Sequence, residues 1–195
     1  MTKTRRYTQR KRAADREETR LRIVEAAMAL HEEIGPSDTT ISAIAQRAGV
    51  QRLTVYRHFP DEAAVFQACT SHWLELNPLP MPAAWEACEG DDERLRAALL
   101  AFYRYYRGTQ RMWQGAHRDE PKVPAIQGPM AEFRAYLREV GEEIGKSCAT
   151  TGDSRLTITL QHALAFTTWA SLESLGLDDE AKAALALAWV QGLER

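Results

Sequence analysis

Hydrophobic residues recur at helical spacing along most of the chain. Ile23, Ala27, Leu30 and Ile34 follow one another at steps of four, three and four residues, which is the period of one helix face. No run of residues alternates with period two between turn residues, and residues 156–160 merge into a helical stripe. The pattern therefore predicts an all-α protein of about nine helices. Further stripes fall at Val65, Cys69 and Leu76; at Leu95, Leu99, Phe102 and Tyr106; at Phe133, Leu137, Val140 and Ile144; at Leu160, Leu164, Thr168, Leu172 and Leu175; and at Leu185, Trp189 and Leu193.

Glycine and proline mark where these helices end. Gly35-Pro36 separates the first helix from a short second one, because the residue before proline avoids α geometry. The alternating prolines of residues 77–82 form the clearest boundary, and residues 121–129 are predicted to be a loop. The predicted organisation is a flexible basic arm over residues 1–15, a helical head over 16–77 and a larger helical body over 78–195. Two long helices, at 154–175 and 178–194, close the body.

The charge of the chain is distributed unevenly. The net charge is −2, yet residues 1–60 carry 12 basic and 7 acidic side chains, a net charge of +5. The remaining 13 basic and 20 acidic side chains give residues 61–195 a net charge of −7. A basic head on an acidic body indicates a protein that binds a polyanion and has a second, non-electrostatic role. On charge alone, a solvated and disordered basic tail is the alternative.

Several classes of protein do not fit the composition. Cys69, Cys88 and Cys148 are odd in number and far apart, so they form neither a disulfide framework nor a C-x-x-C metal site, which favours a reducing cytoplasm. The longest apolar run, residues 183–190, is far shorter than the roughly 18 residues of a membrane helix. The basic N-terminus has no apolar segment behind it, unlike a signal peptide. We therefore expect a cytoplasmic protein with no membrane partner.

Patterns typical of catalysis are weak. Residues 141–147 imitate a phosphate-binding loop but are one residue too short and contain two carboxylates where phosphates would lie. The sequence contains no His-Glu-x-x-His zinc motif, no Gly-x-Ser-x-Gly nucleophile elbow and no Glu-x-x-His pair for a di-iron bundle. We expect no catalytic residue, no metal site and no cofactor.

Residues 41–59 carry the pattern of a helix-turn-helix. Ala45 is small where two helices must cross closely, and Gly49 suits the positive φ that a tight turn demands. Val50 and Val55 are apolar at positions that bury the turn and the inner face of the second helix. A hairpin with an ordinary polar face is the alternative, but such a face without one carboxylate is unusual beside a basic arm. The outer face presents groups able to donate to phosphates and base edges, on Gln51, Arg52, Thr54, Tyr56, Arg57 and His58.

These residues resemble the tetracycline-repressor (TetR) family of bacterial regulators. The motif segments are residues 39–41, 44–45, 48–50 and 54–60, and residues 22–27 resemble the family's first helix. The detailed similarity covers about residues 20–73, and the rest agrees only in length and helical pattern. The resemblance implies a helix-turn-helix DNA-binding domain with a linking fourth helix over 16–77. It also implies an effector-binding and dimerisation domain over 78–195.

The resemblance assigns DNA-contacting roles to particular residues. Arg52 and Thr54 match positions that meet base edges, whereas Ser42 stands where some members place a base-reading Arg and so shortens the reach. Glu62 replaces the Lys with which the family usually meets phosphate. We expect the basic arm to compensate by binding the adjacent minor groove. The other expected contacts are Thr40, Tyr56 and His58 at phosphates, and Gln51 and Arg57 at the flanks.

Aromatic residues gather in the C-terminal part of the chain. Twelve Phe, Tyr and Trp residues lie from Trp73 to Trp189, and most are expected to be core. The dense run at 102–106, with Trp113 beyond it, suits a pocket for an apolar or aromatic effector. We expect His162 first to be a hydrogen-bonded core residue and only second a ligand contact. The resemblance places the pocket among the middle helices, and the expected effector-binding residues are Trp73, Tyr106, Trp113, Phe133, Tyr136, His162 and Phe166.

The expected function combines these parts. The small residues of the last two helices allow close approach and predict a homodimer through a four-helix bundle. The resemblance implies a repressor of a palindromic double-stranded DNA operator that a small-molecule effector releases. An effector-independent DNA-binding adaptor, or an activator of the same fold, is the alternative.

Overall fold

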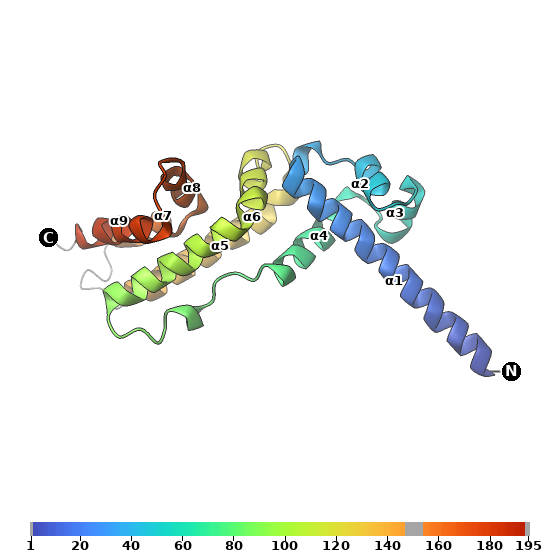
Figure 1. Cartoon of the computed structure of the whole chain (residues 1–195), viewed down its shortest axis with the longest axis horizontal. Coiled ribbons are helices and arrows are strands. Elements are labelled where there is room, and N and C mark those ends of the chain that lie inside the picture. The colour runs from blue at the N-terminus through green and yellow to red at the C-terminus, as the bar shows by residue number, and fades with distance from the viewer. Residues whose placement is uncertain (1, 147–153, 194–195) are drawn as a thin grey trace. The chain divides into compact units, whose positions relative to one another are not determined.

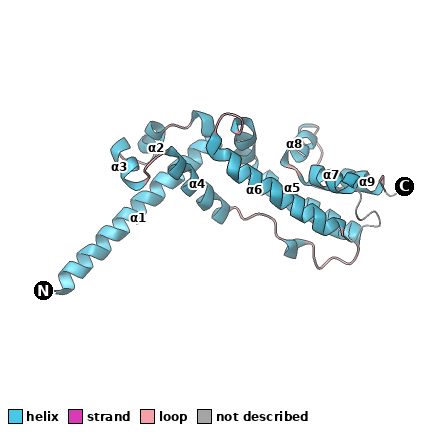
Figure 2. Cartoon of the chain, turned by 180° about the vertical axis from the view of Figure 1, so that it is seen from behind, coloured by secondary structure: helices cyan, strands magenta, loops and turns pink. Residues whose placement is uncertain are grey.

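The computed structural model describes residues 2–146 and 154–193, and these residues are helical with no strand, as predicted (Figures 1 and 2). Cys148, Ser147 of the loop-like motif and Glu194 lie outside the described residues. The described part contains nine α-helices, in agreement with the prediction. The elements are α1 (Thr2–Glu33), η1 (Pro36–Asp38), α2 (Ile41–Arg47), α3 (Arg52–His58), α4 (Glu62–Leu76), η2 (Pro82–Ala84), α5 (Asp91–Asp119), α6 (Pro124–Gly145), α7 (Ser154–Leu164), α8 (Phe166–Ser174) and α9 (Asp179–Gln191), where η denotes a short 3-10 helix.

The helices group into two compact units. Unit 1 comprises Met1–Asn77 together with Gln114–Gln127, and unit 2 comprises Pro78–Trp113 together with Gly128–Arg195. Residues 114–127 were expected in the C-terminal body, whereas in the structure they group with the N-terminal helices. Helix α5 is therefore divided between the units, with its last turns in unit 1.

Unit 1 is built around one apolar cluster. Helix α1 packs against both α2 and α4, and α2 packs against α3. The hydrophobic stripe predicted for the first helix is buried at Ile23, Ala27 and Leu30, whereas Ile34, beyond the end of α1, is 41% exposed. Residues from all four helices and the loops between them complete the cluster, namely Val24, Ala26, Ile41, Ile44, Ala45, Ala48, Val55, Phe59, Val65 and Cys69.

The predicted flexible arm is wrong as a description of residues 2–15, because α1 begins at Thr2 and is continuous to Glu33. The segment contains no Gly or Pro and is rich in Arg, Lys, Gln and Ala, which favour helix. A helix already nucleated by the packed residues adds each further turn without a new nucleation cost. In both views the N-terminal half of α1 extends beyond the other helices of unit 1 (Figures 1 and 2).

The end of α5 fixes the turn between α1 and α2. The buried carboxylate of Asp119 accepts a hydrogen bond from the Ser37 amide at 3.0 Å, and Arg118 donates to the carbonyl of Ile34 at 3.0 Å. Hydrogen bonding from Arg118 and Ser37 lowers the pKa of Asp119 to about 2. Gly35 has φ 90°, and a Cβ there would lie 1.7 Å from Nη2 of Arg118. The turn therefore requires glycine both for its conformation and for this close approach.

Unit 2 is held by aromatic packing between α5, α6 and α8. The sequence predicted one helix over 154–175, but the chain leaves helical geometry at Ala165 and forms α7 and α8 instead. The break frees backbone carbonyls that a continuous helix would use. The Tyr103 hydroxyl donates to the carbonyl of Ala163 at 2.8 Å, and the Tyr106 hydroxyl donates to that of Leu164 at 2.7 Å. Two hydroxyls on α5 thus stabilise a break that the local sequence does not signal.

The predicted loop at residues 121–129 is also only partly correct. Helix α6 starts at Pro124, a favourable residue for a first helical position, and runs through Pro129. Ile126, Met130 and Phe133 are buried at helical spacing. Burial of this stripe offsets the cost of a proline inside the helix.

A buried lysine joins α8 to α9. Lys182 has no exposed surface, and its Nζ donates to Glu173 Oε2 at 2.6 Å and to the carbonyl of Leu177 at 2.5 Å. Arg107 of α5 contacts both Glu173 and Asp179. The charges compensate one another, so this group connects three helices of unit 2 without leaving a buried charge unpaired.

None of the helices in residues 2–146 and 154–193 is both long enough and apolar enough to cross a bilayer.

Candidate nucleic-acid interface

The predicted helix-turn-helix is formed by α2, the four residues 48–51 and α3. Thr40 caps α2, since its hydroxyl accepts a hydrogen bond from the Ala43 amide at 3.1 Å. Gly49 has φ 67°, the left-handed conformation expected for the turn, and the Val50 amide donates to the carbonyl of Ala45 at 2.9 Å. Cap, glycine and hydrogen bond together fix where α3 begins.

Helix α3 is anchored through one side only. Val55 is fully buried and Phe59, just after the helix, is 4% exposed. Both belong to the apolar cluster that contains Ile44 and Ala45 of α2. Because the inner face is fixed in this way, the outer face is presented to solvent by a rigid scaffold.

The outer face of α3 is exposed and free of acidic residues. The Arg52 guanidinium lies 6.0 Å from the ring centroid of Tyr56, a cation–π distance that restricts both side chains. Donors of this kind suit phosphate oxygens and base edges. Of the expected contacts on this face, Gln51, Arg52, Tyr56 and Arg57 are exposed, and Thr54 and His58 are half-buried.

One residue of this face was missed in the sequence analysis. Leu53 is 59% exposed, although it stands between residues of the motif. The exposure of Leu53 could have been predicted from helix geometry, because Val55 faces the core and residue 53 is displaced from it by about 200° around the helix. An apolar side chain there suits contact with the methyl group of thymine.

The two other expected contacts lie at the start of α2, and Glu62, which replaces the usual Lys, lies in the first turn of α4. Thr40 and Ser42 are both exposed at the start of α2. Glu62 is exposed in the first turn of α4, directly after Asp61, whose carboxylate caps the helix by accepting from the Ala64 amide at 2.8 Å. A carboxylate at a helix N-terminus is stabilised by the helix dipole. This interaction gives Glu62 a local structural reason, independent of any contact with DNA.

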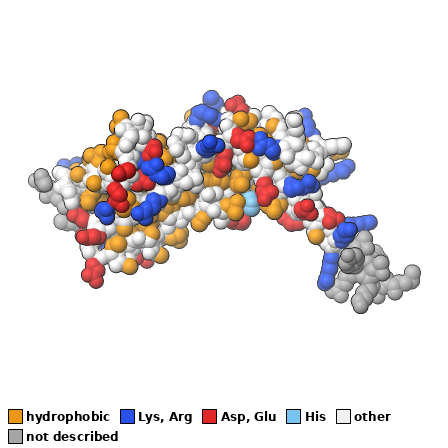
Figure 3. All heavy atoms as spheres, viewed as in Figure 1, with side chains coloured by type: hydrophobic (Ala, Val, Ile, Leu, Met, Phe, Trp, Pro, Cys, Tyr) orange, Lys and Arg blue, Asp and Glu red, His pale blue; other side chains and the backbone are white. Residues whose placement is uncertain are grey.

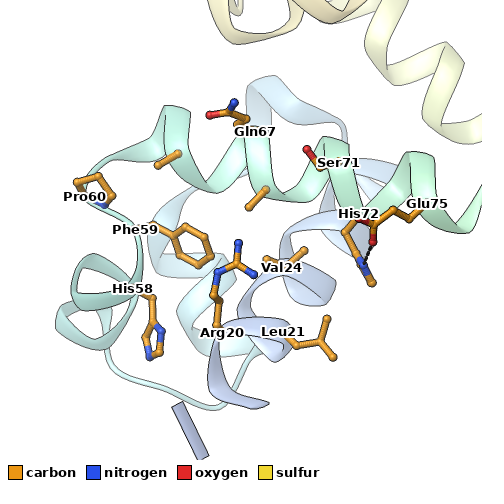
Figure 4. A pocket seen from close by; sticks show the side chains of 12 residues that line it. Arg20, Leu21, Val24, His58, Phe59, Pro60, Gln67, Ser71, His72 and Glu75 are labelled. Carbon is orange, nitrogen blue, oxygen red and sulfur yellow. Dashed lines mark ion pairs between the residues drawn. The ribbon is translucent and has the colours of Figure 1, made fainter. Parts of the chain in front are cut away.

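A groove lies between α1 and α4, beside the end of α3 (Figure 4). It has a volume of about 420 Å³. Arg20 projects into it, with the guanidinium 5.4 Å from the ring centroid of Phe59, and His58 forms its wall at the end of α3. Burial lowers the pKa of His58, and the charges of Arg16 and Arg20 lower it further against the opposing effect of Glu17. A positive surface thus continues from α3 onto α1.

The expected effector-binding residues do not all lie together. Trp73 belongs to unit 1, where its indole donates to Glu32 at 3.3 Å. His162 is exposed, with its ring 6.1 Å from that of Trp189, so the expectation of a core histidine is wrong. Tyr136 packs 6.2 Å from Phe102 and donates to the carbonyl of Pro80. The remaining four form one buried aromatic cluster in unit 2, Tyr106, Trp113, Phe133 and Phe166.

Within the ranges that the structure describes, no three His, Cys, Asp or Glu side chains are arranged to hold a metal ion.

Known proteins match the region that carries this geometry. Residues 23–69 match the family model described as bacterial regulatory proteins, tetR family. The chain is 44% identical over 84 residues to the HTH-type transcriptional regulator SrpR of Pseudomonas putida. This match covers 40% of this chain and 39% of SrpR. The chain is 29% identical over 164 residues to the class A tetracycline repressor protein from transposon 1721 of Escherichia coli, covering 82% of this chain and 68% of that protein. The helix-turn-helix region of the chain, residues 23–69, therefore matches that of the TetR family.

The TetR-family fold extends over most of the chain. A crystal structure of a TetR-like transcriptional regulator from Rhodococcus sp. RHA1 superposes with a TM-score of 0.69 at 21% identity, covering 92% of this chain and 96% of that one. The TetR-family model spans part of α1, all of α2 and α3 and the first half of α4, and it includes every contact expected from α2 and α3 but not the basic arm. The N-terminal half of α1 precedes the matched residues. The match agrees with the prediction of a regulatory protein rather than an enzyme.

Proposed function

We propose that this protein is a DNA-binding transcriptional regulator that reads its operator with α3. The observation that carries the proposal is the exposed, carboxylate-free outer face of α3 on a packed helix-turn-helix. Arg52, Leu53 and Thr54 would meet base edges in the major groove, and Thr40, Tyr56 and His58 would meet phosphates. DNA lies in the cytoplasm of a bacterial cell, so we place the protein there.

A homodimer through α7 and α9 is part of this proposal. Ile158 of α7 is 64% exposed and Leu185 of α9 is 38% exposed, and the small residues Ala184 and Ala188 are exposed beside Leu185. Apolar and small residues on exposed helix faces support close packing with a second copy. Two recognition helices would then reach half-sites about 34 Å apart. DNA selected for binding should therefore contain an inverted repeat, and a single half-site would contradict the dimer.

We propose repression that is released by a small apolar or aromatic effector bound in unit 2. The buried aromatic cluster supports this assignment, and such a ligand would act through its differential affinity for two states of the protein. The alternative is an effector-independent adaptor or activator. A panel of aromatic compounds that changes neither tryptophan fluorescence nor DNA affinity would favour that alternative.

The experiment that tests DNA binding is a titration of a labelled duplex of mixed sequence at low salt. The variant Arg52→Glu/Arg57→Glu places two negative charges on the outer face of α3. We expect wild-type protein to bind with strongly salt-dependent affinity and this variant to bind at least about tenfold more weakly, since phosphate contacts supply non-specific affinity.

The matched control is Arg111→Glu/Arg138→Glu, which changes the net charge equally at two exposed positions of unit 2. It should bind the mixed-sequence duplex nearly as wild-type protein does. Equal losses in the two variants would mean that net charge, rather than α3, governs binding, and would contradict the proposal.

A further inference from the structure

Three arginines follow one face of the N-terminal half of α1. Arg12, Arg16 and Arg20 are spaced by four residues, so they lie close together along one side of the helix. They span about 12 Å at 1.5 Å per residue, which corresponds to roughly three phosphates along one DNA strand. Lys11 and Arg22 lie on another side of the helix, displaced by about 120–140° from the centre of the row.

These arginines are available to a ligand. Arg12 and Arg16 are exposed, and no acidic partner contacts them among the described side chains. The side chain of Arg20 is 43% exposed and pairs with Glu17 at 3.3 Å, an exposed contact that contributes little. Basic side chains are visible on the free part of α1 in Figure 3. The row of charge is therefore not neutralised within its own helix.

The row leads directly to the end of α3. Arg20 lies over Phe59 in the groove that His58 also lines (Figure 4). After burial, the charges of Arg16 and Arg20 contribute to the lowered pKa of His58, so the two arginines and this imidazole share one surface. Acidic residues also border this surface: Asp15 and Glu17 on α1, and Glu75 on α4, which is 3.6 Å from His72.

The helical state of α1 rules out the contact expected for a flexible arm. An α-helix with its side chains is about 10–12 Å wide, whereas the minor groove of DNA is about 6 Å wide. The N-terminal half of α1 cannot enter that groove as a helix. A straight row of arginines can instead follow the sugar–phosphate backbone at its edge.

We propose that Arg12, Arg16, Arg20 and His58 form a phosphate-binding strip for the DNA backbone that flanks the sequence read by α3. The strip rests on the proposed DNA-binding function and adds a second contact region to it. It supplies affinity without sequence preference, and it offsets the repulsion between Glu62 and the backbone.

The test compares two double variants of the full-length protein, Arg12→Ala/Arg16→Ala and the control Lys11→Ala/Arg22→Ala. Both remove two positive charges from exposed positions of α1, and alanine favours helix. Affinities for a selected operator and for mixed-sequence DNA are measured over a series of salt concentrations. Circular dichroism establishes that helix content is unchanged.

We expect Arg12→Ala/Arg16→Ala to reduce the slope of log affinity against log salt by about 2 for each bound subunit, since each phosphate contact contributes roughly 0.9. Affinity at about 0.1 M salt should fall at least about tenfold, by the same factor for both DNAs. The control should change the slope by less than half as much. If the two variants showed the same slope of log affinity against log salt, the proposed strip would be refuted, while operator recognition by α3 would be unaffected. A wild-type protein that does not prefer its selected DNA would instead refute the proposed function.

Discussion

Replacing Arg52 with alanine is expected to reduce operator affinity by about 1–3 kcal/mol for each half-site, with a much smaller loss on mixed-sequence DNA. Arg52 is exposed at the first position of α3, and its guanidinium is restrained near the ring of Tyr56. Such an arginine can donate to O6 and N7 of one guanine together. The loss should therefore fall on discrimination between sequences more than on binding itself.

Arg52→Lys separates base reading from charge. Lysine keeps the positive charge but cannot form the planar, two-point contact of a guanidinium. We expect it to bind mixed-sequence DNA as wild-type protein does and to lose most of the preference for the operator. Fluorescence anisotropy at one fixed salt concentration measures both affinities. An Arg52→Ala variant that loses the same factor on both DNAs would show that Arg52 contacts phosphate rather than a base.

Replacing Tyr106 with alanine is expected to destabilise the fold by about 3–5 kcal/mol, the usual range for removing a large buried aromatic side chain. Tyr106 has no exposed surface, and its ring lies 5.4 Å from Phe166 and 6.0 Å from Trp113. Its hydroxyl donates to the carbonyl of Leu164 at the break between α7 and α8. The substitution would therefore remove packing and leave a buried carbonyl without its donor.

Tyr106→Phe separates these two effects. The ring remains, and only the hydrogen bond to Leu164 is lost, so we expect a cost of about 1–3 kcal/mol. Denaturant unfolding followed by tryptophan fluorescence measures both variants, because Trp113 and Trp169 pack against Tyr106. If Tyr106→Phe were as damaging as Tyr106→Ala, the packing argument would be wrong. A cost near zero would mean that the hydroxyl does not hold the break.

The sequence predicted the helix-turn-helix better than any other part because its signals are local. Thr40, Gly49 and Val55 each have a role that follows from neighbouring residues: a cap, a turn conformation and a buried inner face. The helix-turn-helix could therefore be placed without knowledge of the rest of the fold. Leu53 was not predicted as a contact because only polar hydrogen-bond donors on this exposed face were considered, and Leu53 is apolar.

The errors concern features that local sequence does not determine. Residues 2–15 contain almost no large apolar side chains and were expected to be flexible, but they extend a helix that packing has already nucleated. The break at Ala165 depends on Tyr103 and Tyr106, which are about 60 residues away in the chain. The predicted effector site likewise included Trp73 of unit 1, because the spacing of aromatic residues along the chain does not show which unit each helix joins.

Selection of bound DNA from a random-sequence pool tests the central claim, that α3 reads an operator, most directly. The account predicts enrichment of an inverted repeat whose half-site centres lie about one helical turn, roughly 34 Å, apart. The enriched site should also lose its preference over unselected DNA when Arg52 is replaced by lysine. Repeated rounds that enrich no sequence beyond the starting pool would contradict the claim.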